Sequence, residues 1–124
     1  MRNVKVVASI AVVLAGLNGL NAADAYPVKP VRIIVATGVG GIDDFTARQL
    51  APKLNEFPDQ PFIIENRPGA GGMIAQTFVA KSPPDGYTLL LAGGSMAGAR
   101  YVNANITYDL LRDLTPVSLV TTVG

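Results

Sequence analysis

Three glycine-rich segments hold the groups that could do chemistry in this chain. They are TGVGGI at residues 37–42, NRPGAGG at residues 66–72 and GGSMAG at residues 93–98. A glycine loop that runs into the first turn of a helix presents backbone N–H groups and the positive end of the helix dipole. Such a loop can hold a carboxylate or a phosphate without any basic side chain. Glycines also make ordinary tight turns, and this second reading stays open for each loop.

Two carboxylates and one hydroxyl lie in or beside these loops. Asp43 and Asp44 follow the first loop. Neighbours in sequence point apart in regular structure, so helix capping by either aspartate fits better than shared acid–base chemistry. Ser95, in the third loop, has no histidine to activate it because the chain contains none. We therefore expect no catalytic residue and no enzyme activity.

The composition removes several classes of function. The chain has 124 residues, no cysteine and no histidine, which excludes a disulfide scaffold and a thiolate nucleophile and removes most metal sites. The net charge is +1, so no electrostatic footprint for nucleic acid is visible. The first loop begins like a dinucleotide-binding motif, but Asp43 stands where the last glycine belongs, and no Walker motif occurs. We expect no cofactor, no metal and no nucleic-acid partner.

Residues 1–25 have the layout of a secretory signal peptide. Two basic residues form a positive start, residues 6–17 form an apolar run, and residues 23–25 offer small side chains to a peptidase. A membrane-spanning helix needs about 20 apolar residues, and here two asparagines interrupt the sequence that follows the run. We expect cleavage before Tyr26 and a periplasmic protein. The remaining chain carries eight basic and eight acidic residues and is neutral.

Apolar runs alternate with the glycine loops. Short apolar runs predict four strands, at residues 31–36, 62–65, 87–92 and 116–123. Helical spacing predicts two helices. The first follows the two aspartates and carries Ala47, Leu50, Ala51 and Leu54 on one face, and the second covers residues 73–81. Pro52 stands inside the first of these and predicts a kink or an early end. The alternation of strand, loop and helix predicts an α/β fold with a mainly parallel sheet built from βαβ units.

The three glycine loops should meet in space. Each follows a predicted strand, and the carboxyl ends of parallel strands lie at the same edge of a sheet, where ligands of such folds bind. We therefore expect one composite site at this edge, built from all three loops. The absence of convergence in the structure would contradict this expectation.

Four segments resemble the substrate-binding receptors of tripartite tricarboxylate transporters, the Bug-type periplasmic solute-binding proteins. They are YPVKPVRIIV (26–35), ENRPGAGG (65–72), AKSPPDGYTLLL (80–91) and YDLLRDLTPVSLV (108–120). Their spacing matches as well, and ENRPGAGG followed by PPDGYTLL is a specific combination. The resemblance covers nearly all of the chain after the predicted leader.

The resemblance implies part of lobe one of a type II periplasmic binding protein. Residues 26–124 would form the N-terminal portion of that lobe, and the lobe would be incomplete. The solute would be a small carboxylate held by backbone amides and bridging waters, and a membrane permease would receive it. The main alternative is a truncated, non-binding remnant of such a receptor. An enzyme of α/β fold is the less favoured third reading.

The resemblance also carries ligand binding onto particular residues. They are the backbone of Gly40, Gly41, Gly71 and Gly72, with Asp44 as a helix cap and Ser95 as a weaker candidate. No metal ligand is expected among them.

The chain departs from the family pattern within these loops. The first loop of the family usually reads P-F-x-P-G-G-x-x-D, and here both prolines and the phenylalanine are replaced. The second usually reads G-G-N-I-G, and here Met73 replaces the asparagine and Ala75 the last glycine. Asp43 adds a negative charge where an anion would dock. These changes leave a divergent receptor for another solute and a decayed reading frame both open.

Overall fold

The computed structural model describes residues 26–56, 60–94, 96, 98, 101, 103 and 105–122. The predicted signal peptide at residues 1–25 and the candidate Ser95 lie outside the described residues. Among the residues that are described, no helix has both the length and the apolar character needed to cross a bilayer.

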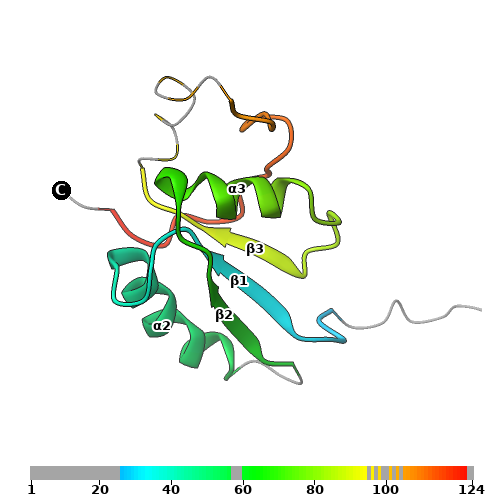
Figure 1. The fold of residues 1–124 in the computed structure, drawn as a ribbon. Coiled ribbons are helices and arrows are strands. Elements are labelled where there is room, and N and C mark those ends of the chain that lie inside the picture. Colours follow the sequence, from blue (N-terminus) through cyan, green and yellow to red (C-terminus); the bar gives the residue numbers. More distant parts are fainter. Residues whose placement is uncertain are drawn as a thin grey trace, which may run out of the picture.

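A three-stranded parallel sheet forms the centre of the described chain (Figure 1). Strand β1 (Val31–Val35) lies between β2 (Phe62–Asn66) and β3 (Thr88–Leu91). The register places Ile33 opposite Ile64 on one side and opposite Leu89 on the other. The predicted α/β class and the parallel βαβ arrangement are confirmed, and three of the four predicted strands lie within two residues of their expected bounds.

The two helices cover opposite faces of this sheet (Figure 1). Helix α2 (Ile42–Leu54) packs its buried Ala47 against Ile33 and Val35. Helix α3 (Met73–Ala80) packs its buried Ala75 against Ile34 and Ala36 on the other face. Successive residues of a strand point to opposite faces, so the unbroken apolar run of β1 serves both helices at once. Because both of its faces are covered, β1 is the most buried strand. The first glycine loop follows the carboxyl end of this strand.

The fourth predicted strand is wrong over the part that the structure describes. Residues 116–122 join no sheet, and Val117 and Leu119 are 81% and 78% exposed. An apolar run becomes a strand only when a neighbouring strand pairs with its N–H and C=O groups, and no strand of the described sheet pairs with residues 116–122. The apolar side chains of this run led to the strand prediction, but they do not reveal whether a partner strand is present.

Pro52 does not end α2 early. The helix continues through it to Leu54, so the proline stands in the last turn. Only the carbonyl of Arg48 loses its helical donor there, because proline has no N–H. A proline near a helix end therefore disturbs less of the hydrogen-bond ladder than one at the centre.

Candidate functional site

The first and second glycine loops touch at the carboxyl edge of the sheet. The N–H of Arg67, just after β2, donates to the carbonyl of Val35 at the end of β1, with an N···O distance of 2.9 Å. Farther along, a Cβ placed on Gly72 would lie 3.2 Å from the Cβ of Ala36. The second loop is therefore in contact with the end of β1, and Nδ2 of Asn66 reaches the first loop itself, where it donates to the carbonyl of Thr37 at 3.1 Å.

The third loop meets the first from the other side. The N–H of Ala36 donates to the carbonyl of Leu91 at the end of β3, at 3.4 Å. A Cβ placed on Gly93 would lie 3.3 Å from Oδ1 of Asp43. Gly93, the first residue of the third loop, therefore lies at the same edge as the other two loops, as predicted, whereas Ser95 and Ala97 lie outside the described residues.

Glycine, not aspartate, caps the first of the two helices. Gly41 is the N-cap of α2, with extended dihedral angles, and Asp43 and Asp44 lie in the first turn. A Cβ on Gly41 would lie 2.8 Å from Oγ1 of Thr37, so a residue with a side chain does not fit there. The prediction that either aspartate is the N-cap is wrong. Asp44 instead reaches back from inside the helix and accepts the N–H of Gly40 at 2.9 Å.

Asp44 is the centre of a buried polar network. Its side chain accepts hydrogen bonds from Nε of Arg48 at 3.0 Å and from Nδ2 of Asn66 at 2.9 Å, besides the one from Gly40. The residue is 2% exposed. The Arg48 guanidinium, followed by the Gly40 N–H and the Asn66 amide, lowers the pKa of Asp44 to about 2 in spite of the opposing effect of burial. The carboxylate therefore stays charged, and it is occupied by the protein itself.

Arg48 and Asn66 are residues that sequence reasoning did not assign to the site. Arg48 stands four residues after Asp44, a spacing that places both on one face of a helix and could have signalled the pair. Asn66 belongs to a different element, the end of β2. No local signal links Asn66 to Asp44, because their contact depends on how β2 aligns with β1.

The second loop enters α3 through three consecutive left-handed residues. Ala70, Gly71 and Gly72 have φ values of 50°, 66° and 91°. They form a short left-handed turn, η2 (Ala70–Gly72), whose dihedral angles at Gly71 are not those of a right-handed 3₁₀ helix, and Gly72 is the buried N-cap of α3. The N–H of Gly72 donates to the carbonyl of Gly69 at 2.9 Å. Glycine is favoured at Gly72 both by this conformation and by the close approach of Ala36.

Most of the glycine amides expected to bind a ligand already have partners. The N–H groups of Gly40, Gly41 and Gly72 donate to Asp44, Gly38 and Gly69 respectively. The first helical bond of α2 runs from Phe45 to the carbonyl of Gly41. Helix geometry therefore leaves the N–H groups of the first turn without a carbonyl one turn earlier. These potential donors belong to Ile42, Asp43 and Asp44.

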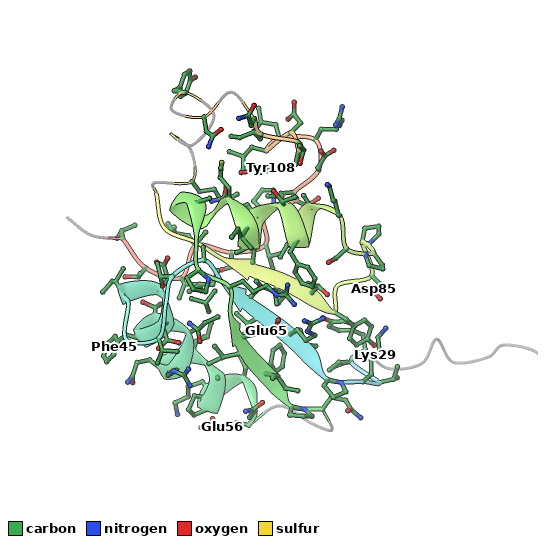
Figure 2. All side chains as sticks on the ribbon, viewed as in Figure 1. Lys29, Phe45, Glu56, Glu65, Asp85 and Tyr108 are labelled. Carbon is green, nitrogen blue, oxygen red and sulfur yellow. The ribbon has the colours of Figure 1, made fainter. Side chains whose placement is uncertain are left out.

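Basic side chains near the second loop turn toward a different face. Nε of Arg67 lies 2.6 Å from Oε1 of Glu65, and its guanidinium lies 3.7 Å from the ring centre of Phe78. Arg32 also pairs with Glu65, which lies over the sheet on the side covered by α3 (Figure 2). The Arg32 guanidinium, with help from Arg67, holds the pKa of Glu65 below its usual range. These arginines therefore stabilise the α3 face rather than the loop edge.

A groove of about 800 Å³ runs beside α3, away from the meeting point of the loops. Ala70 is its one lining residue from the second glycine loop, and Arg32, Phe78 and Lys81 give it a basic and aromatic wall. It is widely open to solvent. Within the described ranges, no group of three acidic, histidine or cysteine side chains could hold a metal ion.

The chain matches a known protein family over more than half of its length. Residues 46–124 match the family model described as the tripartite tricarboxylate transporter family receptor. Protein BugT of Bordetella pertussis is 41% identical over 122 residues, which cover 97% of this chain and 37% of BugT. The chain thus spans about a third of the length of the curated relatives it matches.

Solved structures of similar proteins include two with a bound carboxylate. MatC from Rhodopseudomonas palustris, solved with bound malate, is 35% identical, with a TM-score of 0.65 over 77% of this chain and 33% of MatC. A second R. palustris protein, solved with adipate, is 43% identical, with a TM-score of 0.51. The match covers 52% of this chain and 22% of the chain of that protein. The periplasmic binding protein BugD is 42% identical over a similar share.

Proposed function

Because the chain belongs to the tripartite tricarboxylate transporter receptor family, we propose that it acts as an exported receptor that binds a small carboxylate and delivers it to a membrane permease. The family is one of solute-binding receptors, which supports a role without catalysis. The observation that carries the proposal is the convergence of three glycine loops at one edge of a parallel sheet. That edge is where ligands of such sheets bind.

The proposed contacts are backbone groups held by a rigid frame. The solute carboxylate meets the free N–H groups of the first turn of α2 and the exposed Gly71 in the second loop. The positive end of the α2 dipole favours an anion there. Asp44 and Gly72 contribute by shaping the loops, and Gly93 at the start of the third loop borders the edge. Ser95 remains a weaker candidate for a contact with the solute. Malate and adipate in solved relatives support a small carboxylate as the solute class.

An amide-deletion experiment tests this binding mode. Ile42 is the first residue of α2, is 73% exposed, and follows Gly41, whose φ of −70° and ψ of 164° suit a residue before proline. Ile42→Pro removes one free N–H at a helix position that tolerates proline, whereas Ile42→Ala keeps the N–H. In calorimetric titrations with malate and adipate, we expect Ile42→Pro to weaken binding about tenfold. Ile42→Ala should bind like the parent chain.

Equal binding by the proline and alanine variants would contradict the proposed contact. Circular dichroism of both variants checks that the fold is retained, since the proline change also alters the backbone. The parent chain must bind malate, adipate or another small carboxylate for the proposal to stand.

A non-binding remnant is the competing proposal, and one observation favours it. The amides of Gly40, Gly41 and Gly72 are all engaged within the protein. Under this reading the loops only make turns. A folded parent chain that releases no heat with malate, adipate or other small carboxylates would support the remnant.

Export is proposed separately from binding. Residues 26–124 would be the mature chain, forming the N-terminal portion of lobe one, and residues 1–25 a signal peptide that directs it to the periplasm. Known periplasmic relatives such as BugD support this location. N-terminal sequencing of the protein recovered from a periplasmic fraction should begin at Tyr26. Intact Met1 in the cytoplasmic fraction would contradict export.

A further inference from the structure

The Asp43 carboxylate spans the gap between two of the converging loops. It projects from the first turn of α2, and a Cβ on Gly93 would lie 3.3 Å from its Oδ1 and 4.0 Å from its Oδ2. Gly93 begins the third loop, just beyond β3. A side chain from the first loop region thus places a charged group at the edge where the solute is proposed to sit.

The negative charge of Asp43 has no counter-charge in the described part of the chain. No ion pair or hydrogen bond engages its carboxylate there. The adjacent Asp44 differs, because Arg48 neutralises it. Arg67 faces Glu65 on the other side of the loop. Among the described residues at this edge, Asp43 is therefore the acidic side chain without a counter-charge.

Two neighbouring groups at the N-terminus of α2 favour opposite charges in a solute: the free N–H groups of its first turn and the carboxylate of Asp43. The free N–H groups and the helix dipole, equivalent to roughly half a positive charge, attract one carboxylate. Asp43 repels a second carboxylate and attracts a cation. We propose that Asp43 sets the solute class of this site, favouring a solute that carries an ammonium group as well as a carboxylate over a plain dicarboxylate. This inference rests on the proposed function and makes it more specific.

A pair of solutes that differ mainly in the charge of one end tests the inference. Adipate carries two carboxylates, and 5-aminopentanoate has the same length with an ammonium group in place of one of them. In calorimetric titrations of the parent chain, we expect 5-aminopentanoate to bind at least about five-fold more tightly than adipate. Asp43→Asn should weaken 5-aminopentanoate, strengthen adipate, and so reduce this ratio to near unity.

A second carboxylate variant controls for net charge. Glu56 lies just beyond the other end of α2, exposed and paired with Lys53 (Figure 2). Glu56→Gln changes the net charge of the protein as Asp43→Asn does, but it should leave the ratio unchanged. An equal fall in the ratio with Glu56→Gln would show a general charge effect and overturn the assignment to Asp43.

The outcomes separate this inference from the function on which it rests. If the parent chain binds adipate as tightly as 5-aminopentanoate, and Asp43→Asn leaves the ratio unchanged, the selectivity assignment is wrong while carboxylate binding stands. If neither solute binds the folded parent chain, nor do malate or other small carboxylates, both the binding function and its selectivity fail.

Discussion

Nδ2 of Asn66 donates a hydrogen bond to Oδ1 of the buried Asp44 at 2.9 Å. The same nitrogen also donates to the carbonyl of Thr37 at 3.1 Å. One side chain at the end of β2 therefore holds both the first glycine loop and the first turn of α2. Because Asn66 is also the first residue of the second glycine loop, hydrogen bonds within the protein fix the first and second loops relative to one another. This arrangement needs no bound solute.

Replacing Asp44 by asparagine should change the acid sensitivity of the fold. The pKa of Asp44 is lowered from 3.8 to about 2, so its charged form stabilises the folded state above the ordinary pKa. That contribution is lost as the pH falls through 2. Asp44→Asn should therefore lower the melting temperature at pH 7. It should also reduce the acid-induced loss of stability between about pH 5 and pH 2. Thermal melts followed by circular dichroism at several pH values measure both effects.

Asp43→Asn is the matched control for this change. Asp43 is the adjacent carboxylate but has no hydrogen-bond partner in the described part of the chain. Its replacement should leave the melting temperature at pH 7 nearly unchanged. An acid profile for Asp44→Asn that coincides with the parent profile would show that the network does not stabilise the ionised carboxylate.

Gly72→Ala should destabilise the fold more than the same change at Gly71. Gly72 is buried with a φ of 91°, and its new Cβ would lie 3.2 Å from the Cβ of Ala36 and 3.1 Å from Nε2 of Gln76. Backbone strain and crowding together should cost about 2–4 kcal/mol of the free energy of unfolding. Gly71 has a φ of 66° but open space around it, so alanine there should cost only about 1–2 kcal/mol. Urea unfolding of both variants gives the comparison, and equal losses would contradict the close approach of the two loops.

The order of strands and helices and the meeting of the loops were predictable because they depend on local patterns. The β-branched apolar run at 31–36 is typical of a buried strand, and a glycine loop after each such run places the loops at one edge of a parallel sheet. The run at 116–123 is also rich in β-branched residues, yet its described part joins no sheet. A strand needs a partner, and no local pattern reports whether one is there.

The details of the site depend on contacts between distant elements. Asn66 reaches Asp44 because the sheet register sets it opposite Val35, the last residue of β1. Gly41 rather than Asp43 or Asp44 is the N-cap of α2, and glycine suits this position because a Cβ there would lie 2.8 Å from Oγ1 of Thr37. Neither the Asn66–Asp44 contact nor the identity of the cap has a local signature, and the position of the cap decides which amides are free in the first turn of α2.

Tyr108→Phe should test how the C-terminal part of the described chain is attached to α3. The Tyr108 hydroxyl donates to Oε1 of Gln76, which is 1% exposed. Burial raises the pKa of Tyr108, so the hydroxyl remains a donor at neutral pH. Phenylalanine would leave the buried Gln76 oxygen unsatisfied, at a cost of about 1–3 kcal/mol.

Tyr101→Phe, at a residue that is 85% exposed, should change the free energy of unfolding by less than about 0.5 kcal/mol. Equal effects of the two changes in urea unfolding would show that the hydroxyl of Tyr108 has no stabilising contact.

Pro52→Ala should stabilise the protein. Pro52 is exposed in the last turn of α2 and gives the carbonyl of Arg48 no N–H donor. Alanine restores that bond and suits a helix better by up to about 3 kcal/mol, while the more flexible unfolded chain offsets about 0.4–1 kcal/mol. Because the last turn has fewer bonds to lose, we expect the free energy of unfolding in urea to rise by about 1–2 kcal/mol.

Gln49→Ala, at an exposed position of the same helix, should change the free energy of unfolding by less than about 0.5 kcal/mol. A gain no larger than that of Gln49→Ala would mean that proline already suits the geometry of this last turn, and that α2 is stabilised chiefly by its packing against β1 and β2.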